Sequence, residues 1–210
     1  MTERVVAGYV HPGTVRAEFC ASLLAMAMES GTLAGVLAKE SGPNISTSRN
    51  LIVAEFLKGQ APWLLMVDTD MVFEADAAAG LLKVADPVDA PIVGGLCFSL
   101  EQGEPRPTMY HLAATDPMAF VRAEHWPDSA LVPVTATGAA FLLMHRDALR
   151  TIRKAARDEA APWFRESAVG APLSLMGEDM TFCLRAGAAG IPVHVHTGVK
   201  IGHMKTTMLI

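Results

Sequence analysis

The sequence is poor in cysteine, and its few cysteines are widely separated. Cys20, Cys97 and Cys183 lie among apolar residues in a chain of 210 residues. An odd and scattered set of this kind excludes a disulfide framework and offers no CxxC metal site. We therefore expect three reduced thiols that pack inside the protein.

Charge of one sign is not concentrated anywhere in the chain. The 17 basic and 22 acidic residues give a formal net charge of -5, and neither sign forms a long run. Proteins that bind nucleic acid or anionic membranes nonspecifically normally carry a basic patch or stripe. We expect neither nucleic acid nor a membrane as a partner.

Long hydrophobic runs are missing as well. The opening MTERVVAGYV has one acidic and one basic residue before a short apolar run, which is not the pattern of a signal peptide. The longest uncharged stretch, 129–145, is interrupted by Pro133 and Gly138, so it does not form a continuous lipid-facing helix. These features predict a soluble, cytoplasmic protein.

The chain does contain an alternation of apolar strands and helices. Its length and its 51% hydrophobic residues suit one domain over residues 1–210 rather than two full domains. The predicted strands are 5–10, 63–67, 91–96, 139–144 and 193–196, and the predicted helices are 19–29, 47–58, 76–85, 147–159 and 178 to Gly187 or Gly190. This alternation predicts an α/β fold with a mostly parallel, Rossmann-like central sheet flanked by helices. Segment 63–67, WLLMV, has no polar residue on either face and should be central.

The alternation weakens between residues 99 and 133. Polar residues there follow no period, and five prolines interrupt the segment: Pro105, Pro107, Pro117, Pro127 and Pro133. Proline both fixes the backbone and removes a hydrogen-bond donor, so it interrupts regular elements. We predict a loop-rich insertion in this part of the chain.

Two acids directly follow the apolar segment 63–67. Asp68 and Asp70 are one residue apart, so their side chains leave the chain on the same side. Ligands of open α/β sheets bind at the carboxyl edge, where these acids are expected. Two close carboxylates repel each other, and a divalent cation with oxygen ligands keeps both ionised. The alternative is that one acid caps the following turn while the other is solvated.

A second acidic pair begins the last predicted helix. Glu178 and Asp179 lie in its first turn, ahead of an apolar face. The helix dipole favours negative charge at that position, which is sufficient to explain both acids. A catalytic role for them therefore depends on the rest of the chain.

Three other places are candidates for ligand contact. His203, in the glycine-flanked segment IGHMK, is the most adaptable histidine for a metal. Arg49 begins helix 47–58, where a guanidinium can reach phosphate or a base, although a solvated helix face is the simpler alternative. Pro12 and Gly13 follow the first strand at the same edge, in a loop that Thr14 as a plain N-cap also explains.

Taken in order, several segments resemble a GT-A fold glycosyltransferase of the family 2 type. They are VVAGYVHPGT, the pair Arg49-Asn50, WLLMVDTDMVF, TGAAFLLMHRDAL, GEDMTFCLRAGAAGIPVHV and GHMK, and they span almost the whole chain. The most specific of them is the apolar strand that leads into Asp68-Thr69-Asp70, and the next is Glu178-Asp179.

The resemblance implies a metal site. In that family the DxD acids bind a divalent metal, manganese or magnesium, and the nucleotide part of the donor. This implies that Asp68 and Asp70 do so here, with Asp70 as the stronger metal ligand. The family often adds a late histidine to the metal shell, and His203 matches that position.

The resemblance also implies the catalytic and nucleotide-binding residues. The general base of inverting members matches Asp179, and Glu178 beside it would contact the acceptor. Pro12, Gly13 and Arg49 would border the nucleotide. The QxxRW-type motif of processive members is missing, which indicates a single transfer.

The predicted function is therefore metal-dependent transfer of one sugar, with inversion, from a UDP- or GDP-linked donor to a hydroxyl on a protein or glycoside. One alternative is a nucleotidyltransferase with the same metal site, which usually has a glycine-rich, basic first loop that HPGTVRAE does not supply. Another is a non-catalytic module that binds a nucleotide sugar. The sequence leaves open whether the chain forms a homo-oligomer.

Overall fold

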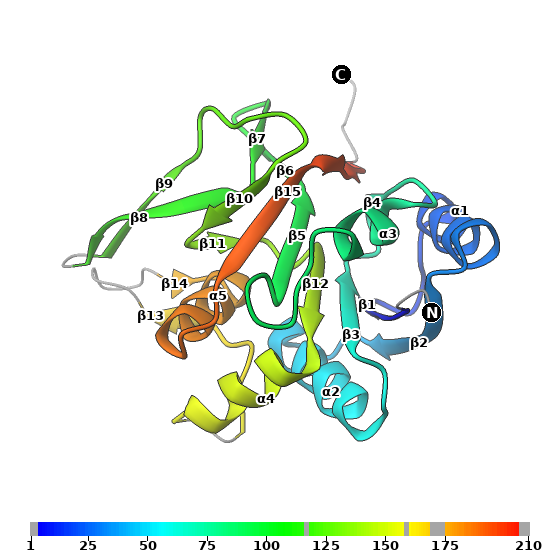
Figure 1. The fold of residues 1–210 in the computed structure, drawn as a ribbon, viewed down its shortest axis with the longest axis horizontal. Helices are drawn as coiled ribbons and strands as arrows, with labels where there is room; N and C mark the ends of the chain where they lie inside the picture. The colour runs from blue at the N-terminus through cyan, green and yellow to red at the C-terminus, as the bar shows by residue number, and fades with distance from the viewer. Residues whose placement is uncertain (1–3, 116–117, 158–159, 169–174, 206–210) are drawn as a thin grey trace.

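The computed structural model describes residues 4–115, 118–157, 160–168 and 175–205. Its centre is a seven-stranded sheet in the order β10-β15-β5-β12-β3-β1-β2, which crosses the molecule in Figure 1. These strands are β1 (Val5–His11), β2 (Leu33–Glu40), β3 (Trp63–Val67), β5 (Ile92–Leu96), β10 (Leu131–Val134), β12 (Phe141–His145) and β15 (Val193–Lys200). The central position predicted for segment 63–67 is confirmed.

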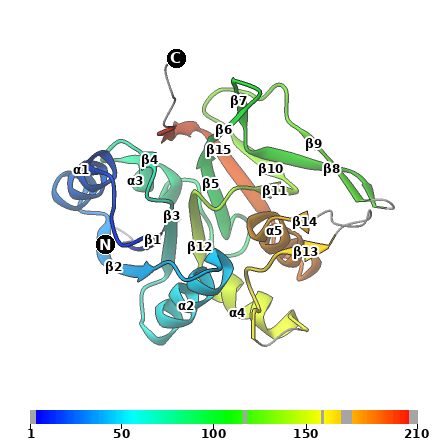
Figure 2. The same ribbon diagram turned by 180° about the vertical axis from the view of Figure 1, so that it is seen from behind.

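Helices cover both faces of this sheet, as Figures 1 and 2 show from opposite sides. On one face lie α1 (Ala17–Ala25), its π-helical continuation η1 (Met26–Ser30) and α3 (Ala77–Leu82). On the other lie α2 (Ile45–Lys58), α4 (Arg146–Ala155) and α5 (Glu178–Ala188). The predicted α/β layering is confirmed, although α4 ends short of the predicted Glu159, which lies outside the described residues.

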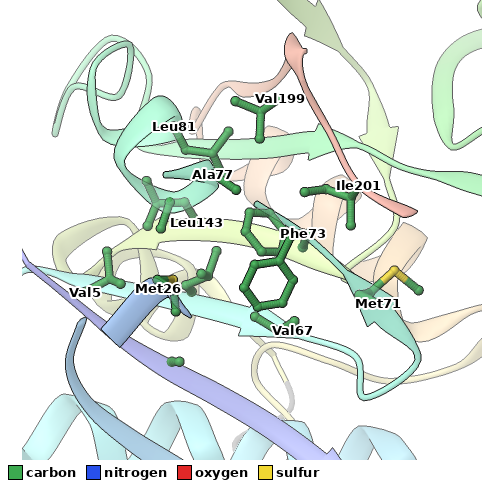
Figure 3. Packing of buried hydrophobic residues seen from close by; sticks show 14 of the residues in the cluster. Val5, Met26, Val67, Met71, Phe73, Ala77, Leu81, Leu143, Val199 and Ile201 are labelled. Carbon is green, nitrogen blue, oxygen red and sulfur yellow. The ribbon is translucent and has the colours of Figure 1, made fainter. Parts of the chain in front are cut away.

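Burial on both faces explains why β3 has no polar residue. Side chains alternate along a strand, and accordingly Trp63, Leu65 and Val67 pack into the cluster beneath α1 and α3, part of which Figure 3 shows. Leu64 and Met66 pack into the cluster beneath α2, α4 and α5. All five side chains are at most 1% exposed.

The sheet is mixed rather than mostly parallel. Strand β1 is parallel to β2 and β3, and β15 is parallel to β5. Strand β12 is antiparallel to both of its neighbours, β3 and β5, and β10 is antiparallel to β15. An apolar run such as FLLMH indicates burial on both faces. It does not indicate direction, which is why the prediction of a mostly parallel sheet was wrong.

The predicted loop-rich insertion is also wrong, because this part of the chain is largely strand. It forms β6 (Phe98–Glu101), β7 (Glu104–Pro107), β8 (Met109–Thr115), β9 (Met118–Arg122) and β11 (Ala136–Thr137), besides β10. Pro105 and Pro107 lie in the two-stranded β6–β7 hairpin, and Pro133 lies in the edge strand β10. Proline is tolerated at strand edges, where its missing N–H faces no partner. Pro117 lies outside the described residues.

Four short strands complete the fold around the carboxyl end of β3 and the start of α5. Strand β4 (Met71–Val72) pairs with β16 (Gly202–His203), and β13 (Ser167–Ala168) pairs with β14 (Leu175–Met176). The first pair brings the end of the described chain beside the segment that follows β3.

All three cysteines are free thiols, as predicted. Cys97 and Cys183 are buried, and burial raises the pKa of each thiol to about 12. Both therefore stay protonated and unreactive at neutral pH. Within the described ranges, no helix has the length and apolar character needed to cross a membrane.

Close packing between β1 and α2 gives a first testable prediction. A Cβ added at Gly8 would lie 2.5 Å from Ile52 Cγ2, a branched atom in the core that cannot easily move away. We expect Gly8→Ala to lower the free energy of unfolding by about 1–3 kcal/mol, measured by chemical denaturation. Gly35→Ala on the edge strand β2 is the matched control, because its Cβ would meet nothing within 4 Å. Equal stability of the two variants would contradict the packing described here.

Candidate functional site

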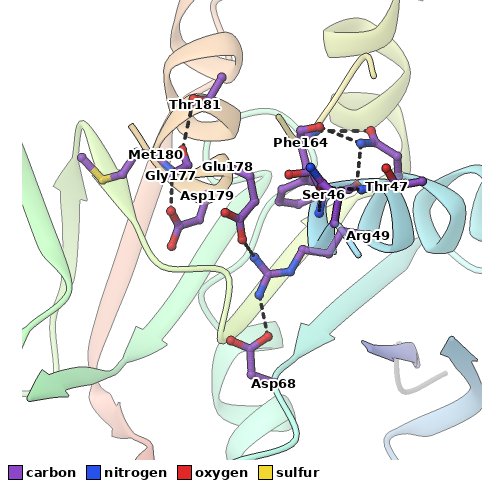
Figure 4. Close-up of polar contacts among 12 residues, drawn as sticks. Ser46, Thr47, Arg49, Asp68, Phe164, Gly177, Glu178, Asp179, Met180 and Thr181 are labelled. Atoms are coloured by element: carbon purple, nitrogen blue, oxygen red, sulfur yellow. Dashed lines mark hydrogen bonds and ion pairs between the residues drawn. The ribbon is translucent and has the colours of Figure 1, made fainter. Parts of the chain in front are cut away.

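Three charged side chains meet at the carboxyl edge of the central sheet. Asp68 follows β3, Arg49 lies in the second turn of α2, and Glu178 is the first residue of α5. Arg49 Nη2 lies 2.6 Å from Asp68 Oδ1, and Arg49 Nη1 lies 2.5 Å from Glu178 Oε1. Figure 4 shows the guanidinium between the two carboxylates. One arginine thus joins three separate elements.

Local hydrogen bonds hold the start of α2 and the neighbouring chain in place. Asn44 caps the helix by accepting from the N–H groups of Ser46 and Thr47. The side chain of Asn50 accepts from the backbone N–H groups of Trp163 and Phe164 and donates to the Phe164 carbonyl. The ring of Phe164 then lies 5.8 Å from the Arg49 guanidinium carbon. The Arg49 side chain therefore extends from a capped helix and passes over the ring of Phe164.

The charge on Arg49 is almost shielded from water. Its side chain is only 4% exposed, whereas that of Glu178 is 15% and that of Asp68 is 32% exposed. Burial by itself would lower the pKa of the guanidinium, but the charges of Asp68 and Glu178 outweigh it and the pKa is raised. Arg49 is therefore a permanent positive charge at the site.

This arrangement differs from the one that the sequence suggested for Arg49. The guanidinium was expected to reach a phosphate or a base, but in the structure it contacts two carboxylates instead. It also neutralises Asp68, so repulsion between Asp68 and Asp70 is relieved without a metal. Asp68 and Asp70 lie at the predicted carboxyl edge of the sheet, because they directly follow β3.

Asp70 meets His203 through the short β4–β16 pair. The backbone N–H of Met204 donates to the Asp70 carbonyl, and His203 Nε2 lies 2.9 Å from Asp70 Oδ2. His203 Nδ1 lies 2.7 Å from the Phe98 carbonyl, so we assign the ring hydrogen to Nδ1. The Nε2 nitrogen then faces the Asp70 carboxylate, and Lys205 Nζ lies 3.3 Å from the same carboxylate oxygen.

Asp70 and His203 have the chemistry of a metal site. Carboxylate oxygen and imidazole nitrogen both suit Mn²⁺, and carboxylate suits Mg²⁺. Within the described residues, however, no group of three or more His, Cys, Asp or Glu side chains is arranged to hold a metal. Magnesium often uses one or two protein carboxylates and completes its shell with substrate phosphates and water. The pair therefore fits a metal that is also held by a phosphorylated ligand.

Asp179 is a largely buried acid in the first turn of α5. Burial, then the neighbouring charge of Glu178, raises the pKa of its carboxyl group, even though the N–H of Met180 donates to Oδ1. A Cβ added at Gly138 would lie 3.6 Å from Asp179 Oδ2, so the glycine leaves room beside the carboxylate. A raised pKa suits a group that accepts a proton near neutral pH.

The predicted loop at Pro12 and Gly13 lies at the carboxyl end of β1, at the same edge of the sheet as Asp68. Both residues are exposed. Gly13 has a φ of 97°, a conformation that other residues rarely adopt, and its N–H donates to His11 Nδ1. The loop thus has a defined shape, and its role at a nucleotide stays a prediction.

The structure also points to Tyr110, which no pattern in the sequence indicates. Tyr110 lies on β8, beneath the Arg122 guanidinium, whose carbon is 4.9 Å from the centre of the ring. Burial raises the pKa of the phenol, Arg122 opposes this, and the charge of Asp179 adds to it. An aromatic residue in a segment interpreted as loop carries no signal that could have identified it.

The buried charge on Arg49 gives a second prediction. In Arg49→Met, Glu178 and Asp68 lose their partner, so we expect the free energy of unfolding at pH 7 to fall by about 2–4 kcal/mol. Chemical denaturation measures the loss. Arg150→Met is the matched control, because Arg150 pairs with Asp147 at 3.0 Å but both side chains are more than half exposed. Its loss should stay below about 1 kcal/mol. Similar losses in both variants would show that the buried ion pairs of Arg49 contribute no more to stability than the exposed pair of Arg150.

Comparison with known proteins places this geometry in a structural context. No protein-family model and no curated protein sequence matches the chain. Among solved structures, A197 from STIV is similar with a TM-score of 0.59 and 15% identity, over 97% of this chain and 86% of that one. GalNAc-T7, solved with UDP, GalNAc and Mn²⁺, is similar with a TM-score of 0.57 and 10% identity, over 96% of this chain and 44% of that one.

At such low identities these similarities concern the fold alone. They cover nearly the whole of this chain, and this chain spans less than half of GalNAc-T7. The similarity to GalNAc-T7 supports a GT-A-like fold, in agreement with the resemblance of the sequence segments.

Proposed function

We propose that the protein is a metal-dependent glycosyltransferase that moves one sugar from a nucleoside diphosphate donor to an acceptor hydroxyl, with inversion. The observation that carries this proposal is the convergence of Asp70 with His203 at the edge where Asp68, Glu178 and Asp179 also lie. The similarity of the fold to GalNAc-T7, a structure that holds UDP, GalNAc and Mn²⁺, supports it.

Asp70 and His203 are the residues that would hold the metal. A divalent cation held there would act as a Lewis acid and would stabilise the negative charge on the leaving diphosphate. Asp68 lies two residues before Asp70 in the chain, and its Oδ1 lies 2.6 Å from Arg49 Nη2. We assign Asp68 to contact with the nucleotide. The ion pair with Arg49 holds the orientation of the Asp68 carboxylate.

Asp179 acts as the general base. The acceptor oxygen attacks the anomeric carbon, the bond from that carbon to the diphosphate oxygen breaks, and the hydroxyl proton passes to Asp179. Burial raises the pKa of this carboxyl group, which strengthens it as a base once it is ionised. Inversion follows when the acceptor attacks from the face opposite the diphosphate. Glu178, bound to Arg49, positions the first turn of α5 that carries Asp179.

A non-catalytic nucleotide-sugar-binding module is the second candidate. It is favoured by one observation: Arg49 Nη2 lies 2.6 Å from Asp68 Oδ1, so an arginine already pairs with one of the two acids expected to bind a metal. A module of this kind would bind a nucleotide sugar without turning it over, so turnover separates the two candidates.

The metal site gives the third prediction. We expect UDP or GDP with Mn²⁺ to raise the melting temperature by about 5 °C or more at 100 times the dissociation constant. The same nucleotides without Mn²⁺ should have a much smaller effect, and one sugar conjugate should be hydrolysed slowly. Asp70→Asn should remove the Mn²⁺-dependent part and lower turnover at least about 100-fold. Binding without hydrolysis in the unaltered protein would favour the module, and no Mn²⁺-linked shift for any nucleotide would contradict the proposal.

Asp179 gives the fourth prediction, which separates stability from activity. The pKa of Asp179 is raised above its ordinary value of 3.8, because burial disfavours the ionised carboxylate. Below pH 3.8 the carboxyl group is protonated in both the folded and the unfolded chain. As the pH rises through the raised pKa, the buried group must ionise, and the folded protein becomes less stable. Asp179→Asn, which removes the buried charge, should therefore raise the melting temperature at pH 7 and have less effect at pH 4. Sugar transfer should fall by about 10²–10⁴-fold, with nucleotide binding little changed. A lower melting temperature at pH 7 would show that the carboxylate is stabilised in the folded protein.

A further inference from the structure

A cavity of about 730 Å³ lies between the β6–β7 hairpin and the chain that follows β9. Its volume is in the range of small-molecule binding sites. The lining residues that matter here are two aromatic rings and four charged side chains: Phe98, Glu101, Arg106, Arg122, Glu124 and Trp126. Figure 1 shows the β6–β7 hairpin at the top of the molecule, with β9 to its left.

The floor of the cavity is aromatic and firmly supported. Phe98 and Trp126 are partly buried and pack on a small core that includes Leu96, Met109 and Val195. Both residues line the cavity, so each contributes part of an aromatic side chain to its wall. A flat ring face of this kind packs well against the C–H groups of a planar or chair-shaped ligand.

The walls carry charges of both signs. Arg122 is anchored, because it donates to the Pro107 carbonyl at 2.9 Å and to Ser99 Oγ at 3.0 Å, and pairs with Glu101 at 3.1 Å. Arg106 and Glu124 are exposed at the cavity. Two acids and two arginines leave the lining without excess charge, which disfavours a phosphate, and the presence of four charged side chains disfavours a lipid tail. They provide both donors and acceptors, which suit a neutral ligand with several hydroxyl groups.

Two contacts connect this cavity with the proposed reaction site. The carbonyl of Phe98 accepts a hydrogen bond from His203 Nδ1 at 2.7 Å, so Phe98 belongs both to the cavity and to the support of the metal pair. Arg122 lies over the ring of Tyr110, and Tyr110 is within electrostatic reach of Asp179. The cavity therefore shares Phe98 with the support of the Asp70–His203 pair, and Arg122 connects it to the ring of Tyr110.

We propose that this cavity binds a saccharide unit of the acceptor, with its ring against Trp126 and its hydroxyls bonded to Arg122 and the neighbouring acids. The proposal rests on the proposed function and narrows it, because it makes the acceptor a glycoside. Arg122 and Trp126 are then specificity-determining residues for the acceptor.

The first test measures binding without any catalysis. Of the three tryptophans, Trp63 and Trp163 are at most 2% exposed, so the accessible fluorescence signal belongs to Trp126. We would titrate the protein with methyl glycosides of glucose, galactose, mannose, N-acetylglucosamine and N-acetylgalactosamine. At least one should change the emission saturably, and Trp126→Phe should remove that change. No saturable change with any glycoside, or the same change in Trp126→Phe, would overturn the proposal.

The second test uses transfer and separates this proposal from the general one. Donor hydrolysis with Mn²⁺ and no acceptor reports on the reaction site alone, whereas transfer to a glycoside requires the cavity. Trp126→Ala and Arg122→Gln should raise the KM for the glycoside at least about tenfold and leave hydrolysis within about twofold. Arg150→Gln on α4, outside the cavity, is the matched control and should change neither. Unchanged KM values in both cavity variants would overturn this proposal and leave the proposed function standing.

One further outcome would contradict the proposed function and leave saccharide binding in the cavity standing. If the fluorescence titration shows saturable glycoside binding that Trp126→Phe abolishes, but no sugar nucleotide is turned over, the cavity is a saccharide site and the glycosyltransferase proposal fails.

Discussion

Arg49 holds the candidate site together because it is a permanent charge almost shielded from water between two carboxylates. Its partners are distant in the chain, 19 residues away at Asp68 and 129 residues away at Glu178. A buried guanidinium without partners would be costly, so α2, the end of β3 and the start of α5 must come together for the protein to fold. The edge at which a ligand would bind is therefore also a requirement for stability.

Two kinds of chemistry lie next to the partners of Arg49. Asp70 follows Asp68 closely in the chain, and the short β4–β16 pair brings it to His203, whose other ring nitrogen lies 2.7 Å from the Phe98 carbonyl. Asp179 directly follows Glu178, in a setting that raises the pKa of its carboxyl group. The ion pairs of Arg49 therefore join the segment that carries the Asp70–His203 pair to the helix that carries Asp179.

The strands between β5 and β12 add what the doubly covered sheet does not provide. They place Tyr110 beside Arg122 and surround a cavity with aromatic and charged walls. The central sheet and its helices bury two continuous apolar clusters. Most side chains on the sheet are therefore needed for packing and are not available to bind a ligand. Small antiparallel hairpins at the edge have one solvated face, so they can carry the residues that recognise a particular ligand.

The sequence by itself determined the layered α/β arrangement, the central position of WLLMV, the free thiols and the presence of acids at the ends of β3 and the start of α5. The first two follow from local apolar patterning, which responds to burial and to the strand or helix period. The free thiols follow from the odd number and wide spacing of the cysteines, and the acids are the residues that follow the apolar strand and begin the helix. Only the tertiary structure decided that β12 runs antiparallel, that the proline-rich segment forms strands, that Arg49 bonds two acids and that His203 meets Asp70. Strand direction and contacts between side chains on separate elements depend on how the elements pack, and no short stretch of sequence contains that information.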